Sequence, residues 1–152
     1  MKHIWTIICL NTIEDKKTNN ASLIEVVDRL VLEGSLPDVR PLNLPFPLPL
    51  YVVSNWWRDD DEDRFQYRAR MSLISPQGET LKIFETTVNL VDYPRIRATL
   101  EMETFPFTGS GIYTLDISHL EENRWIPAAS IPLEIVHEQP ELETERESEP
   151  AS

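Results

Sequence analysis

Apolar and polar side chains alternate along much of this chain, with the period of two residues that is typical of β-strands. The clearest alternation covers residues 65–73, where the odd positions are apolar or aromatic and the even positions are polar. Residues 113–118 repeat this pattern, and residues 96–103 show the same alternation with the apolar side chains at even positions. Each of the three segments is therefore predicted to be a strand with one buried face and one solvated face.

Four other segments predict strands from different patterns. Residues 3–10 form an apolar run interrupted only by small or polar side chains, which predicts a strand buried on both faces. Residues 50–57 and 131–135 are also apolar enough to be strands. Residues 80–90 are predicted to pair with residues 65–73 through a turn at 75–78. Their apolar side chains switch from odd to even positions midway, which predicts a bulge or an edge crossing in this strand.

Residues 21–32 support two interpretations. Ser22 followed by Glu25 is a capping-box pattern, and the apolar positions that follow could line one face of a helix. Against a helix stand the β-branched side chains, which favour a pleated strand: Ile24, Val26, Val27 and Val31. We predict a strand over residues 22–32.

Residues 105–118 predict a hairpin that carries a recognisable corner. Gly111 precedes Tyr113 by two residues at the start of an alternating segment. In immunoglobulin-like sandwiches a tyrosine at such a corner bonds through its hydroxyl to nearby backbone. We expect Tyr113 to do the same and to support the core.

Together these elements predict an all-β fold. About eight strands, frequent turns and four glycines indicate an antiparallel two-sheet β-sandwich over residues 1–137, immunoglobulin-like or C2-like. Residues 36–50 contain five prolines, which lack the backbone N–H that a central strand needs, and are predicted to be an extended crossing segment or an edge. A proline-rich recognition motif is the alternative, but no two of these prolines have the spacing of a PxxP ligand. Residues 138–152 hold almost no apolar side chain and are predicted to be a disordered acidic tail.

Charge and cysteine content narrow the possible partners and the compartment. The net charge of −12 argues against binding to nucleic acid or to an anionic membrane. Cys9 is the only cysteine, so the chain has no intramolecular disulfide and we expect a cytoplasmic protein. A signal peptide is the alternative interpretation of the N-terminal apolar run, but no small-residue cleavage site follows it.

The sequence carries no recognised catalytic pattern. It has no nucleophile elbow and no phosphate-binding glycine loop before a helix, and its three histidines are far apart. We therefore predict no catalytic residue, no metal ligand and no cofactor. The acidic run at residues 59–63 is the one alternative, because calcium binds carboxylate oxygens in the loops of C2-like sandwiches, although its spacing is not that of an EF-hand.

Trp56, Trp57 and Arg58 are the most informative side chains for binding. Adjacent strand residues point to opposite faces, and the parity of residues 48–52 places Trp56 inward. Trp57 would then lie outside, beside Arg58, and tryptophan and arginine are enriched at binding hot spots. Trp57 and Arg58 are accordingly predicted to bind a partner. The alternative is that Trp57 is covered by the proline-rich segment.

Several short motifs resemble an uncharacterised bacterial family of small β-sandwich proteins. They are Ile8-Cys9-Leu10, the run from Asn19 to Asp28, and the final Gly-x-Tyr hairpin. The resemblance implies a sandwich fold with a strand at residues 22–32, and it implies no activity. The leading hypothesis is thus a non-enzymatic cytoplasmic module that binds a protein partner; the alternative is a calcium-dependent or enzymatic sandwich that uses the carboxylates of residues 59–63.

Overall fold

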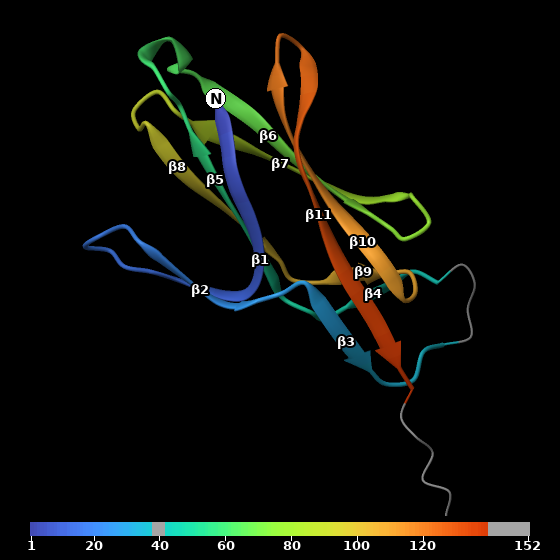
Figure 1. The fold of residues 1–152 in the computed structure, drawn as a ribbon. Helices are drawn as coiled ribbons and strands as arrows, with labels where there is room; N and C mark the ends of the chain where they lie inside the picture. Colours follow the sequence, from blue (N-terminus) through green and yellow to red (C-terminus); the bar gives the residue numbers. More distant parts are fainter. Residues whose placement is uncertain (38–41, 140–152) are drawn as a thin grey trace, which may run out of the picture.

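The computed structural model describes residues 1–37 and 42–139, and in this part of the chain the fold is all-β, as predicted (Figure 1). It contains eleven strands rather than about eight, and no α-helix within the described residues. The strands form a four-stranded sheet, a five-stranded sheet and a short two-stranded sheet. The additional strands arise because residues 22–32 are divided between two strands, and because short strands form in the proline-rich segment and in the first arm of the corner hairpin.

The four-stranded sheet has the order β2-β1-β5-β8, and all its neighbours are antiparallel. Its strands are β2 (Ala21–Val26), β1 (Lys2–Glu14), β5 (Leu50–Trp57) and β8 (Arg95–Met102). The expected end of the first strand at residue 10 was wrong. β1 continues to Glu14 because its polar residues pair with β2, and the turn is confined to the residues between these strands.

The five-stranded sheet has the order β3-β11-β10-β6-β7. Its strands are β3 (Arg29–Glu33), β11 (Arg124–Glu138), β10 (Gly111–Glu121), β6 (Gln66–Ile74) and β7 (Thr80–Asn89). The register of β6 with β7 shifts between Leu73 and Ile74, so the predicted irregularity is present, near the start of β7 rather than in its middle. β3 pairs with β11 in the parallel direction, so the expectation of a wholly antiparallel arrangement was wrong.

Residues 22–32 are extended, which confirms the strand interpretation, but they belong to two sheets. β2 pairs with β1 and β3 pairs with β11, so the chain crosses between the sheets at Val27 and Asp28. Glu25 adopts a left-handed backbone conformation just before this crossing, with φ of 53°. The crossing is fixed by backbone bonds from Val27 to Ile8 and from Glu134 to Asp28.

The third sheet joins the proline-rich segment to the corner hairpin. It consists of β4 (Leu44–Phe46) and β9 (Phe105–Phe107), whose phenylalanines Phe46 and Phe107 pack edge to face at 5.8 Å. The predicted crossing segment therefore includes a short strand. Residues 38–41 of that segment lie outside the described residues.

One hydrophobic core lies between the two large sheets. It contains side chains from both, among them Ile8, Val52 and Trp56 from one sheet and Met71, Leu115 and Ile135 from the other. Of the predicted tail 138–152, the structure describes only Glu138, the last residue of β11, and Gln139; the rest lies outside the described residues.

The corner at Tyr113 is formed as predicted. The Tyr113 hydroxyl donates to the carbonyl oxygen of Gly109 at 2.7 Å and accepts from the backbone N–H of Thr108 at 2.8 Å. Its ring is fully buried against Phe105. Gly111 enters β10 with φ of +151°, where a Cβ would lie 2.7 Å from the Cβ of Pro76. Glycine is required there by both the backbone conformation and the close approach of Pro76.

Candidate binding surface

The four-stranded sheet turns one face toward the core and one face away from it, and we name the second the outer face. Directly paired residues of antiparallel strands share a face. The register therefore places on the outer face the rows Lys2–Trp57–Arg95, Trp5–Asn55–Arg97, Ile7–Val53–Thr99 and Val26–Cys9–Tyr51–Glu101. The alternate residues of the same strands, such as Ile8, Val52 and Trp56, belong to the core.

The outer face is unusually apolar along β1 and β2. β1 contributes Trp5, Ile7 and Cys9 to it, and on β2 the side chain of Val26 is 63% exposed. Antiparallel sheets with one solvated face normally carry polar side chains there. The centre of the other large sheet follows that rule, with the polar outward pairs Arg70 with Ser118 and Ser72 with Asp116, although Ile83 on the edge strand β7 and Ile112 at the start of β10 are exposed there.

The prediction that residues 3–10 are buried on both faces was therefore only partly right. Ile8 and Cys9 are buried on opposite faces, whereas Ile4 is exposed where the register of β1 shifts between His3 and Trp5. Cys9 is fully buried in the middle of the outer face, and burial raises the pKa of its thiol. Residues 3–10 of β1 are thus as apolar as a strand covered on both faces, but the outer face to which they contribute is partly open to solvent.

Trp57 lies on the outer face, as predicted, at the C-terminal end of β5. Its side chain is 38% exposed, while that of Trp56 is fully buried. The guanidinium of Arg95 lies over the indole, 5.2 Å from the ring centroid. This is the geometry of a cation–π contact. The sequence did not predict the contact, because it depends on the register between β5 and β8.

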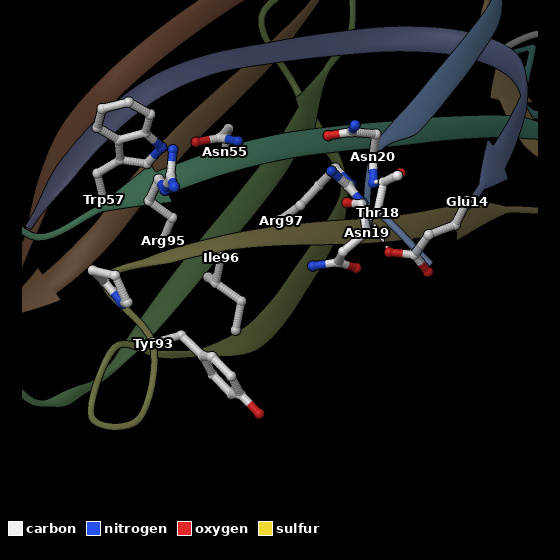
Figure 2. Close-up of a pocket in the computed structure, with 11 residues that line it drawn as sticks. Glu14, Thr18, Asn19, Asn20, Asn55, Trp57, Tyr93, Arg95, Ile96 and Arg97 are labelled. Atoms are coloured by element: carbon white, nitrogen blue, oxygen red, sulfur yellow. Dashed lines mark hydrogen bonds and ion pairs between the residues drawn. The ribbon is translucent and has the colours of Figure 1, made fainter. Parts of the chain in front are cut away.

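A pocket of about 560 Å³ opens beside Trp57, between β5 and β8 on one side and the β1–β2 turn on the other (Figure 2). Trp57, Arg95 and Asn55 line its first side. Glu14 and Asn19 belong to the second side. The pocket joins the exposed end of the outer face, so the two form one continuous candidate surface.

Arg97 holds the two sides of the pocket together. Its Nη2 atom donates to Oε1 of Glu14 at 2.8 Å and to the carbonyl oxygen of Asn19 at 2.9 Å. Asn19 has a left-handed backbone with φ of 58°, which suits asparagine better than most residues. The β1–β2 turn is thereby fixed against β8, and the pocket has a defined wall.

Asn55 contributes an unused polar group to the pocket. It lies on the same face as Arg97, its direct partner across β5 and β8. Its Oδ1 atom is buried without a hydrogen-bond partner in the described part of the chain. Buried polar side-chain atoms usually have such a partner. Asn55 is therefore a group whose hydrogen-bonding capacity the fold itself does not satisfy.

Arg58 contacts the acidic loop that follows it. Its side chain is only 9% exposed, and its Nη1 atom contacts Oδ1 of Asp61 at 3.0 Å. Its Nε atom is buried without a partner among the described residues. The structure therefore brings Trp57 together with Arg95 and places Arg58 against the acidic loop, while the binding role of Trp57 and Arg58 stays a prediction.

The acidic residues 59–63 contact cations of the protein itself. Asp59 pairs with Lys2 at 2.6 Å, and Asp63 lies 3.2 Å from the amino group of Met1, at the end of the molecule where β1 begins (Figure 1). Asp61 pairs with Arg64 and Arg58, and these guanidinium groups lower the pKa of its carboxyl. Asp60 caps the short helix η1 (Asp61–Asp63) by accepting from two backbone N–H groups.

These contacts give the loop a structural role without an added ion. Within residues 1–37 and 42–139, no group of three or more His, Cys, Asp or Glu side chains is arranged to hold a metal ion. In the same part of the chain, no helix is long and apolar enough to cross a membrane.

Comparisons with known proteins add no assignment: the chain matches no protein-family model and has no significant sequence match among curated proteins. The resemblance of residues 8–10 and 19–28 to a bacterial sandwich family accordingly stays a prediction. The candidate surface must be judged from its own geometry.

Proposed function

We propose that this chain is a non-enzymatic protein-binding module and that the outer face of its four-stranded sheet is the binding surface. The observation that supports this most directly is the contrast between the two large sheets. The centre of one has polar outward pairs, with exposed isoleucines only at its edge strand and at the start of β10, whereas the centre of the other presents Trp5 and Ile7 outward, next to Val26 and Trp57. Exposed apolar areas rimmed by polar residues are typical of protein-interaction sites.

The side chains on this face suit a binding hot spot. Trp57 offers a large indole that is partly exposed and held in place by Arg95. Tryptophan and arginine dominate the energetics of many interfaces, and they do so where neighbouring contacts exclude water. Val26 and Ile13, exposed by 63% and 56%, extend the apolar area toward the β1–β2 hairpin.

We also propose that the fold is a β-sandwich of the immunoglobulin-like class that acts in the cytoplasm. The shared core of the two sheets and the corner at Tyr113 support the first point. The parallel pairing of β3 with β11 is a departure from a purely antiparallel sandwich. The single cysteine supports the second point, because a disulfide within the chain is impossible.

Quantitative affinity capture with matched variants tests the binding surface. Trp57→Ala and Val26→Ser change exposed side chains of the outer face, and Ile83→Ser is the control because Ile83 is similarly exposed but lies on β7 of the other sheet. We expect a partner whose affinity falls about 30-fold with Trp57→Ala, the equivalent of about 2 kcal/mol, and is unchanged with Ile83→Ser.

Two results would overturn the proposal. One is a partner whose capture depends on Ile83 and not on Trp57 or Val26, because the binding surface would then be the other sheet. The other is concentration-dependent dimerisation of the isolated chain that is abolished by Val26→Ser. In that case the outer face would be covered by a second copy and not by a different protein.

A further inference from the structure

We infer that the pocket beside Trp57 binds an acidic side chain of the partner, with Arg95 as the residue that contacts its carboxylate. This inference rests on the proposed protein-binding function and specifies the chemistry of one part of the surface. It follows from the arrangement of Arg95, Trp57, Asn55 and Arg97 on one face of β5 and β8 (Figure 2).

Arg95 is oriented but not used by the fold. Its guanidinium lies over the Trp57 ring, and no carboxylate in the described part of the chain forms an ion pair with it. Stacking on an indole uses the flat face of the guanidinium and leaves the N–H groups on its edge free. Those groups match the two oxygens of a carboxylate, which can accept two parallel hydrogen bonds.

Arg97 differs from Arg95, since its Nη2 group already donates to Glu14 and to the carbonyl oxygen of Asn19. We assign it to the wall of the pocket and not to ligand contact.

Asn55 lies next to Trp57 along the same face and diagonal to Arg95, and its amide oxygen has no partner within the described residues. An amide can turn to donate to a carboxylate or to accept from a peptide N–H. An acidic residue within a peptide offers both groups.

The charge of the pocket favours the same ligand. Two arginines and one glutamate line it, in a chain whose net charge is −12. Glu14 is paired with Arg97, so Arg95 supplies the net positive charge of the lining. Repulsion from distant acidic residues is screened over about 8 Å at physiological salt. Its volume of about 560 Å³ exceeds that of one carboxylate side chain. The exposed ring of Tyr93 at the pocket can contact the remaining apolar atoms of the peptide.

Titration with blocked pentapeptides, followed by NMR of the Trp57 indole N–H, tests this assignment. The probes are acetyl-Gly-Ala-Glu-Ala-Gly-amide and its glutamine counterpart, which differ only in the carboxylate. We expect a saturable shift with the glutamate peptide, about tenfold weaker binding of the glutamine peptide, and about tenfold weaker binding of the glutamate peptide to Arg95→Gln. Arg124→Gln, an exposed arginine at the start of β11, is the control and should bind like wild type.

Equal binding of the two peptides, no loss with Arg95→Gln, or no saturable shift up to about 10 mM peptide would overturn the assignment. Its failure is separable from failure of the proposed function. If partner capture depends on Trp57 while Arg95→Gln changes neither capture nor peptide binding, the module binds protein and the carboxylate assignment is wrong. If the glutamate peptide binds as expected but partner capture is independent of the outer face, the protein-binding proposal is wrong and the pocket remains an anion site.

Discussion

Trp56 and Trp57 are consecutive residues with opposite surroundings. Trp56 is fully buried, donates from Nε1 to the Ser54 hydroxyl at 3.0 Å, and packs edge to face against His3 at 5.0 Å. Trp57 is partly exposed on the outer face under Arg95. A single strand thus places one indole in the core and the next at the candidate binding surface.

This arrangement predicts that the two tryptophans separate folding from binding. Trp56→Ala should lower the free energy of unfolding by about 3 to 5 kcal/mol, since it empties a large core site. Trp57→Ala should lower it by about 1 kcal/mol or less, because its ring is partly solvated and its cation–π contact is weak. Urea denaturation of both variants measures the difference. Equal and large losses would show that Trp57 is a core residue.

The buried hydroxyl of Tyr113 provides a second prediction. Tyr113→Phe removes the acceptor for Thr108 N–H and the donor to the Gly109 carbonyl, leaving two backbone groups of the corner without these partners. The loss should be about 1 to 3 kcal/mol of unfolding free energy, measured by urea denaturation. Tyr93→Phe is the matched control, because Tyr93 is exposed, and should leave stability unchanged. A Tyr113→Phe variant as stable as wild type would mean that the corner contributes shape and not hydrogen-bond energy.

Features that depend on neighbouring residues were predictable from the sequence. The opposite orientations of Trp56 and Trp57 follow from strand parity, and the corner follows from the spacing of Gly111 and Tyr113. The strand character of residues 22–32 follows from their β-branched side chains. In each case the information lies within a few residues of the chain.

Features that depend on register between distant strands were not predictable. The contact of Arg95 with Trp57 requires β8 to pair with β5 in one particular register, and the parallel pairing of β3 with β11 requires the chain to change sheets at Val27. Neither leaves a local pattern. Arg58 illustrates the converse: its neighbour Trp57 suggested a shared surface, but the side chain turns toward Asp61 instead.

Gly111 gives a third prediction, based on space and backbone conformation together. Gly111→Ala should lower the free energy of unfolding by at least about 1 to 3 kcal/mol, because φ of Gly111 is +151°, a backbone conformation that alanine rarely adopts. The added Cβ would also lie 2.7 Å from the Cβ of Pro76. Gly34→Ala is the matched control: φ is +134°, but no atom lies within 4 Å of its added Cβ. Thermal or urea denaturation should show a larger loss for Gly111→Ala. Equal losses would assign the whole effect to backbone strain.

The last prediction concerns pH and the half-buried imidazole of His3. Burial lowers the pKa of His3, and the nearby charge of His119 lowers it further. His3 also contacts the Thr6 hydroxyl at 2.7 Å, and Glu121 lies 3.6 Å from His119. In the unfolded chain His3 should titrate near about 6.5. Below that pH the unfolded state binds a proton that the folded state resists, so stability should fall as the pH decreases from about 7.5 toward about 5.

His3→Gln should flatten this dependence, because it removes the group whose pKa differs between the two states. The carboxyls of Asp61 and Glu85 also have lowered pKa values, caused by their arginine partners, but their unfolded counterparts titrate near about 4. Their contribution is lost only at lower pH, which leaves the range between about 5 and about 7.5 for histidine. Urea denaturation at several pH values in that range measures the slope. Superimposable profiles for wild type and His3→Gln would show that burial of His3 does not destabilise its protonated form.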